Sequence, residues 1–189
     1  MSHKNKHIFF LDTEFEEEIG LNGETIVTLI SVGLVGISKE RKMSAASYYG
    51  VSNAFNESAL KREWLVKNVL SKLPAQEARQ SLEEIRQGIL NCFSKADEIE
   101  IWADHPYDFI ILRQLFGGHN EMYDAINEKT GGSLKFRNLN ELSRVVPFVE
   151  REKQTAGKRH IAIEDAKAGR INYINMSEAL PNHLKAHLL

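Results

Sequence analysis

The chain of 189 residues has a single cysteine, Cys92, and only four prolines. One cysteine excludes any disulfide within the chain, and it fits a reducing, cytoplasmic setting, which we expect for this protein. Cys92 falls on the apolar side of a predicted helix, so we interpret it as a buried apolar residue rather than as a reactive thiol.

The sequence also lacks a long apolar run and an excess of charge of one sign. No stretch approaches the roughly 20 apolar residues of a membrane span, and the first ten residues lack the pattern of a secretory signal, so we expect no membrane association. The net charge of −2 excludes no partner, because basic groups can gather locally. Length and a hydrophobic content of 42% favour one globular domain over residues 1–189.

Hydrophobic patterning predicts strands first and helices later. Apolar and β-branched runs predict three strands joined by short turns, and Gly33 and Gly36 predict a bulge in the second; the strands are expected at 7–13, 24–37 and 43–51. Helical spacing and end signals predict helices at 59–74, 81–93, 106–118 and 163–174, with strands at 98–103 and 134–136. This order predicts an α/β fold in which a three-strand antiparallel meander precedes alternating helices and strands. The mixed sheet should carry helices on both faces.

Two acidic residues follow directly after an apolar segment in the stretch IFFLDTEFEE, residues 8–17. Asp12 and Glu14 are two positions apart, so the period of a strand places both side chains on one face. Like charges this close repel one another, and a divalent cation relieves the repulsion, since Mg²⁺ and Mn²⁺ prefer carboxylate oxygens. The alternative is an acidic, solvated turn, which an Asp-Thr-Glu tripeptide alone does not exclude.

Further acids and one histidine lie at the starts of predicted helices. Asp108 is in the first turn of the helix at 106–118, and Asp165 is in the first turn of the last helix, with His160 in the loop before it. Each has an ordinary explanation, because the helix dipole favours an acid at an N-terminus and histidine is common on surfaces. The combination is less common, and it indicates a site assembled from the ends of several elements.

This combination resembles the DEDDh 3′–5′ exonucleases of the ribonuclease H-like superfamily over most of the chain. The similarity lies in Asp12-Thr13-Glu14 on the first strand, in Tyr107-Asp108 at a helix start, and in the spacing from His160 to Asp165. Within the superfamily the chain is most similar to the bacterial polyadenylate-specific exoribonuclease (RNase AS) family, through DTEF, WLVKNVLSKLP, IEIWADHPYD and HIAIEDA.

The resemblance implies two-metal hydrolysis of phosphodiester bonds. Asp12, Glu14, Asp108 and Asp165 would hold two Mg²⁺ ions, for which Mn²⁺ would substitute, and His160 would be the general base, since an ordinary pKa of about 6.5 suits this task near neutral pH. Asp104 competes with Asp108, but the preceding Tyr107 and the following helix favour Asp108. The resemblance also implies single-stranded RNA with adenylate-rich 3′ ends as substrate, and a homodimer.

Four residues near these motifs are candidates for contacts with the substrate. Phe15 either stacks on the terminal base or belongs to the core, and His105 either reaches the site or lies in a turn. Lys158 and Arg159 precede the candidate base and could contact phosphates. Single-strand binding needs only an aromatic platform and a few basic groups.

Other functions remain open at this point. A single-stranded DNA exonuclease or an oligoribonuclease would use the same chemistry, and the 2′-hydroxyl leaves no simple motif that separates them. A catalytically silent RNA-binding module belongs to another class, but all five catalytic positions are intact. A Mg²⁺-dependent phosphatase would also need carboxylates, without this pairing of Asp-x-Glu and His-x₄-Asp.

Overall fold

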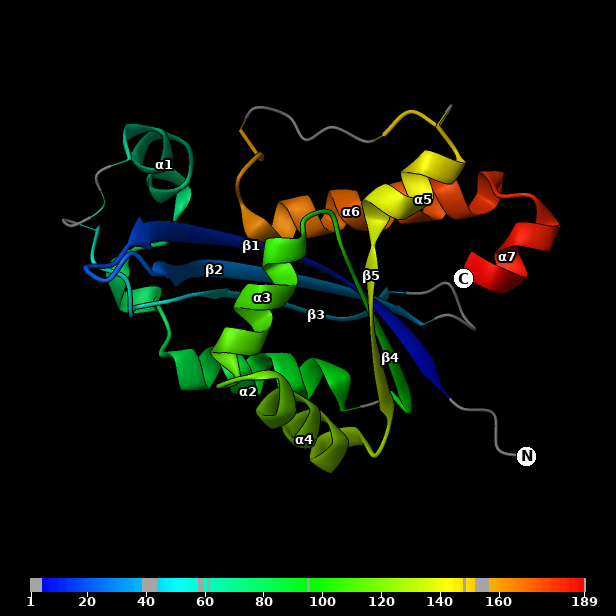
Figure 1. Ribbon diagram of the computed structural model, residues 1–189, viewed down its shortest axis with the longest axis horizontal. Helices are drawn as coiled ribbons and strands as arrows, with labels where there is room; N and C mark the ends of the chain where they lie inside the picture. The colour runs from blue at the N-terminus through cyan, green and yellow to red at the C-terminus, as the bar shows by residue number, and fades with distance from the viewer. Residues whose placement is uncertain are drawn as a thin grey trace.

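A mixed five-stranded sheet forms the centre of the molecule (Figure 1). The computed structural model describes residues 5–38, 44–57, 60, 62–94, 96–147, 149–151 and 157–188. The strand order is β3-β2-β1-β4-β5, with β1 and β2 antiparallel, β2 and β3 antiparallel, and β4 and β5 parallel to β1. The strands are β1 (Lys6–Ile19), β2 (Thr25–Ser38), β3 (Ser44–Val51), β4 (Glu98–Ala103) and β5 (Ser133–Asn138). The predicted meander and mixed sheet are therefore confirmed.

Helices cover both faces of the sheet, as predicted (Figure 1). One face packs against α2 (Leu82–Phe93), α3 (Pro106–Leu115) and α4 (His119–Thr130). The other packs against α5 (Leu139–Val145), α6 (Ala162–Ala179) and α7 (Asn182–Leu188). Residues of β1 alternate between these two cores: Phe9 joins the first and Phe10 the second, as expected of a strand buried on both sides.

A third, smaller core lies beneath α1 (Glu63–Asn68). The predicted helix at 59–74 is too long: α1 ends at Asn68 and is followed by two 3₁₀ turns, η2 (Leu70–Lys72) and η3 (Gln76–Ala78), while residues 59 and 61 lie outside the described residues. The side chains of Asn68 and Ser71 donate hydrogen bonds to the carbonyls of Trp64 and Lys67, and such bonds compete with regular helix.

The first strand is also longer than predicted, and this changes where the carboxylates lie. The prediction ended the strand at residue 13, but β1 continues to Ile19 because β2 pairs with it along its whole length. A bulge between Glu14 and Phe15 interrupts the register. On its other side β1 pairs with β4 only as far as Phe10, so Asp12 and Glu14 lie inside a strand but beyond the end of β4.

The remaining differences concern bulges and unpredicted helices. The bulge predicted at a glycine of the second strand is wrong in position: the β1–β2 register skips Ile30 of β2, and the shift between Val35 and Ile37 leaves the extra residue on β3. Three helices were not predicted, α4, α5 and α7. The first two bury few apolar side chains: α4 buries only Met122 and Ile126, and α5 only Leu139 and Leu142. Among the residues that the structure describes, no helix is both long and apolar enough to cross a membrane.

Candidate active site

Eight of the nine candidate residues line one cavity of about 1030 Å³ at the end of β4. They are Asp12, Glu14, Phe15, His105, Asp108, Arg159, His160 and Asp165. Lys158 is the exception: its side chain is 61% exposed and its ammonium lies 3.4 Å from Glu164. The four carboxylates and the histidine are up to 153 positions apart in the chain, between Asp12 and Asp165, and the sheet brings them to one place.

Asp108 is fixed by a residue between the two β1 carboxylates. The backbone N–H and the hydroxyl of Thr13 both donate to Asp108 Oδ1, at 3.0 Å and 2.7 Å. Because Thr13 points to the opposite side of β1 from Asp12 and Glu14, its hydroxyl ties the start of α3 to the strand. The sequence indicated a helix start at Asp108 but gave no sign of this bond.

Asp104, the competitor of Asp108, is exposed and has different partners. Its carboxylate lies 2.5 Å from the guanidinium of Arg151, and its carbonyl accepts a hydrogen bond from Asn140. Asp108 is only 3% exposed. Both line the cavity, so the choice of Asp108 as a metal ligand stays a prediction, and its burial beside Asp12 supports it.

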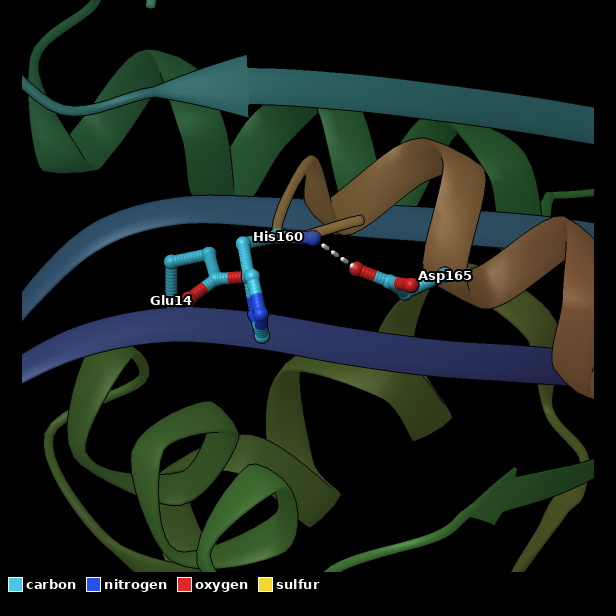
Figure 2. A group of neighbouring side chains, drawn as sticks. All are labelled: Glu14, His160 and Asp165. Atoms are coloured by element: carbon cyan, nitrogen blue, oxygen red, sulfur yellow. Dashed lines mark hydrogen bonds and ion pairs between the residues drawn. The ribbon is translucent and has the colours of Figure 1, made fainter. Parts of the chain in front are cut away.

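His160 and Asp165 form a compact unit at the start of α6 (Figure 2). The backbone N–H of His160 donates to Asp165 Oδ2 at 2.7 Å, so the acid closes the loop that carries the histidine. His160 has φ of 59°, a left-handed conformation that is uncommon outside glycine and asparagine. Its Nδ1 lies 3.9 Å from Glu14 Oε1 on the neighbouring strand.

Gly33 allows α6 to approach the carboxylates of β1. Gly33 pairs with Asp12 in the sheet, and a Cβ atom at this position would lie 2.3 Å from the backbone of Ala162. Any other residue would therefore have to push the first turn of α6 off the sheet. The absence of a side chain lets Asp165 and His160 meet Asp12 and Glu14.

The carboxylates hold protons unusually tightly. Burial, and next the charges of Asp108, Glu14 and Asp165, raise the pKa of Asp12 well above its usual range. Burial and neighbouring acids raise the pKa of Glu14 to about 8, and burial raises the pKa of Asp108 to about 6 despite the hydrogen bonds from Thr13. Burial and the nearby cations Arg159 and Lys72 lower the pKa of His160, so its imidazole is neutral at pH 7.

These shifts predict how the stability of the metal-free chain depends on pH. A carboxyl group with a raised pKa in the folded state stabilises the fold fully below its unfolded pKa, and this contribution is lost as the pH rises through the folded value. For Glu14 this window runs from 4.5 to about 8. We therefore expect the melting temperature in chelator to fall between pH 5 and pH 8. The free energy of unfolding should fall by a few kcal/mol, because each unit of pKa shift is worth about 1.4 kcal/mol.

The lowered pKa of His160 has the opposite effect, because it makes the fold more stable as the pH rises toward 6.5. This effect is smaller, since it concerns one partly exposed group. Mg²⁺ should raise the melting temperature more at pH 8 than at pH 5, because protons compete with the cation for the carboxylates. A melting temperature in chelator that stays flat or rises over this range would contradict the clustering of acids.

The donor set fits divalent cations. Glu14, His160 and Asp165 each offer one ligand atom, and these atoms lie within 4.8 Å of one another (Figure 2). The mutual repulsion that raises the carboxylate pKa values is the repulsion that a cation would relieve. This group of three differs from the predicted ligand set, because it includes His160 and does not include Asp12 or Asp108.

Two aromatic residues, Phe15 and His105, line the cavity, and the ring of Tyr107 lies between them. The rings of Phe15 and Tyr107 are stacked, with centroids 5.5 Å apart and an interplanar angle of 14°. The rings of Tyr107 and His105 are also stacked, with centroids 5.4 Å apart and an angle of 19°. The hydroxyl of Tyr107 donates to Glu17, which fixes the middle ring. Phe15 is thus partly buried against Tyr107 and still lines the cavity, so both readings of this residue hold in part.

Several residues around the site were not predicted. Arg151 and Asn172 line the cavity, while Trp64 and Lys72 contact the loop that carries His160. Lys72 is 87 positions away from Arg159 and Trp64 is 96 positions away from His160, and no local pattern signals such contacts.

Comparison with known proteins gives matches only among solved structures. No protein-family model and no curated protein matches the chain. The nuclease domain of 3′hExo, a DEDDh family member solved with bound rAMP, aligns with a TM-score of 0.58 and 12% identity over 94% of both chains. A 3′-exonuclease solved in 3′-end recognition of a histone mRNA stem-loop aligns at 0.57 and 9%, over 94% of this chain and 84% of that one.

Exonuclease I aligns at a TM-score of 0.54 and 10% identity, and the alignment covers 96% of this chain but 43% of exonuclease I. At such identities the likeness concerns the fold. The chain therefore has the ribonuclease H-like α/β fold found in these exonucleases.

Proposed function

We propose that the chain is a metal-dependent 3′–5′ exonuclease, in a single domain over residues 1–189. The observation that carries the proposal is the convergence of Asp12, Glu14, Asp108, Asp165 and His160 on one cavity. Solved structures of the same fold include 3′-exonucleases of the DEDDh family, which supports the assignment. A silent binding module would not need four buried or half-buried acids that repel one another.

The residues divide the chemical work. The four carboxylates would hold paired divalent ions, which would supply positive charge at the scissile phosphate. The neutral imidazole of His160 accepts the proton of the attacking water, a new O–P bond forms, and the bond from phosphorus to the 3′ oxygen breaks. The products are a nucleoside 5′-monophosphate and a chain shorter by one nucleotide. The carboxylate of Asp165 accepts a hydrogen bond from the backbone N–H of His160 and so holds the loop of the base. The hydroxyl of Thr13 donates a hydrogen bond to Asp108 and holds that carboxylate.

The substrate proposed is single-stranded RNA. The ring of Phe15, backed by Tyr107, offers a flat surface for the terminal base, and His105 offers an imidazole at the other end of the stack. Arg159 lines the cavity and could contact a phosphate, whereas Lys158 would first have to leave Glu164. Single-stranded DNA and very short oligoribonucleotides are the alternative substrates.

The test is digestion of end-labelled poly(A), poly(U), poly(C) and single-stranded DNA, with Mg²⁺ or with chelator. We expect mononucleotides released from the 3′ end, and no reaction in chelator. Release from the 5′ end, internal cleavage, or undiminished activity in chelator would refute the exonuclease assignment. A phosphatase would release inorganic phosphate from a 3′- or 5′-phosphorylated end and leave the chain length unchanged.

A preference for adenylate is proposed from the local similarity to the RNase AS family. Stacking tolerates every base, so a preference requires hydrogen bonds to the edge of adenine, for which the imidazole of His105 or the backbone near Phe15 is available. One good base contact is worth roughly 1–3 kcal/mol, or about one to two orders of magnitude in rate. We expect poly(A) to be degraded at least several-fold faster than poly(U) or poly(C) at matched salt; equal rates would remove this proposal and leave the chemistry intact.

A homodimer is proposed from the same similarity. Light scattering at micromolar concentration should give about twice the mass of 21.5 kDa calculated for one chain. A monomer mass under these conditions would remove the proposal.

A further inference from the structure

The segment 62–72 holds the loop that carries His160. The indole of Trp64 lies edge-to-face against the His160 imidazole, with ring centroids 4.7 Å apart and an interplanar angle of 75°. The ammonium of Lys72 donates a hydrogen bond to the carbonyl of Arg159, the residue before. Two contacts from one short segment therefore act on two consecutive residues of this loop.

The same segment is anchored to β1 just beyond the bulge. The guanidinium of Arg62 donates to the carbonyl of Glu17 at 2.5 Å and lies 3.4 Å from the buried carboxylate of Glu16. Leu65 and Val69 fix its inner side in the third core. The segment thus links the strand that bears Asp12 and Glu14 to the loop that bears His160.

The His160 loop needs such support. A left-handed conformation at a residue with a Cβ persists only where surrounding contacts hold it. The hydrogen bond to Asp165 fixes the backbone of His160, but it does not fix the direction of the ring. The ring contact with Trp64 does.

Trp64 is poorly placed for a role in the core or on the substrate. It is 54% exposed, and it does not line the cavity. Large exposed apolar side chains are ordinary, but an exposed indole whose edge contact is with the candidate base has a specific geometry. Its effect on the reaction must pass through His160.

We infer that Trp64 is a positioning residue that holds the His160 imidazole toward Glu14 and the scissile phosphate. The inference rests on the proposed function. Without the indole, the imidazole would turn toward solvent for part of the time, and proton transfer would slow while substrate binding would not change. Trp64→Ala should lower kcat about tenfold with KM unchanged, which is less than the loss expected for removal of the base itself.

Three variants separate the ring contact from general packing. Trp64→Phe keeps an aromatic ring and should recover most of the rate, whereas Trp64→Leu keeps apolar bulk without a ring and should resemble Trp64→Ala. Val66→Ala, at a 44% exposed position of the same helix, is the matched control and should behave as the wild type. Full turnover by Trp64→Leu would overturn the inference, and it remains decisive if the alanine variant is unstable.

A double-mutant cycle tests the route of the effect. In a His160→Ala background, Trp64→Ala should cause no further loss of turnover, because the two residues act as one unit. Losses that multiply would show that Trp64 acts by another path and would overturn the inference.

One readout does not depend on activity. The indole ring current should shift the imidazole proton resonances of His160, identified by their loss in His160→Ala, and Trp64→Ala should return them to ordinary positions. If Trp64→Ala leaves the imidazole resonances of His160 unchanged, the ring contact between Trp64 and His160 does not exist in solution. If the wild type degrades no nucleic acid, the proposed function fails while the shifted resonances still report the contact.

Discussion

Replacing Asp12 with asparagine is expected to lower turnover by about three orders of magnitude or more and to remove most of the stabilisation that Mg²⁺ or Mn²⁺ provides. Asp12 is the carboxylate whose charge is disfavoured by four other acids at once, in falling order Asp108, Glu14, Asp165 and Asp104. A cation that relieves this repulsion is worth several kcal/mol at the transition state, and each 1.4 kcal/mol or so is a factor of ten in rate.

The metal-free variant gives a second, opposite signal. Removal of one of the repelling acids should raise its melting temperature above that of the wild type at high pH, where the carboxyl groups of the site lose their protons and repel one another. Added Mg²⁺ should then raise it less, since binding at about 100 times the dissociation constant stabilises a folded protein by roughly 2.7 kcal/mol only if the site is intact.

Thermal unfolding with and without metal measures both effects. Asp104→Asn is the matched control: Asp104 lines the same cavity but pairs with Arg151, and its variant should keep the metal response. An undiminished Mg²⁺ or Mn²⁺ shift in Asp12→Asn would show that the ions bind elsewhere. Loss of the response in Asp104→Asn but not in Asp108→Asn would reverse the assignment of these two acids.

Replacing His160 with alanine is expected to lower turnover by about two to four orders of magnitude, the usual contribution of a general base. The neighbouring cations and burial lower the pKa of His160, so the free imidazole that accepts the proton predominates at neutral pH. The rate of the wild type should accordingly fall only at a pH below the ordinary histidine pKa value of 6.5, and the variant should lose this dependence.

Metal binding separates the two roles that the geometry allows for His160. As a base, His160 can be removed and the Mg²⁺-dependent rise in melting temperature persists. As a ligand beside Glu14 and Asp165, its removal weakens that rise. His119→Ala, on the exposed surface of α4, serves as the control and should change neither quantity. A near-normal rate for His160→Ala from pH 6 to pH 8 would exclude both roles.

The local signals of the sequence were sufficient for the sheet and for the positions of the acids. The run from Ile8 to Leu11 is buried on both faces, as its composition requires, and the spacing of Asp12 and Glu14 places them on one face. The capping box of Ser81 and Glu84 and the proline at the start of α3 mark helix starts that the structure reproduces.

What the sequence did not reveal are the features that depend on distant partners. The continuation of β1 beyond residue 13 requires β2 as its partner, because the acidic residues 16–18 on their own resemble a loop. The hydrogen bonds from Thr13 to Asp108 join residues 95 positions apart. The contact of Trp64 with His160 depends on how α1 packs against the sheet. Such contacts follow from the packed fold, and no short window of sequence contains them.

Because α6 must dock closely against Gly33, we expect the site to be completed late in folding. Asp12, Glu14 and Asp108 can come together once β1, β4 and α3 have formed, but His160 and Asp165 arrive only when α6 docks against Gly33. Contacts between such distant parts of a chain form slowly, because a long loop must close first. Cations bound across β1 and α6 would then oppose the local opening of α6, so the helix that completes the site would exchange its amide hydrogens most slowly when the metal is present.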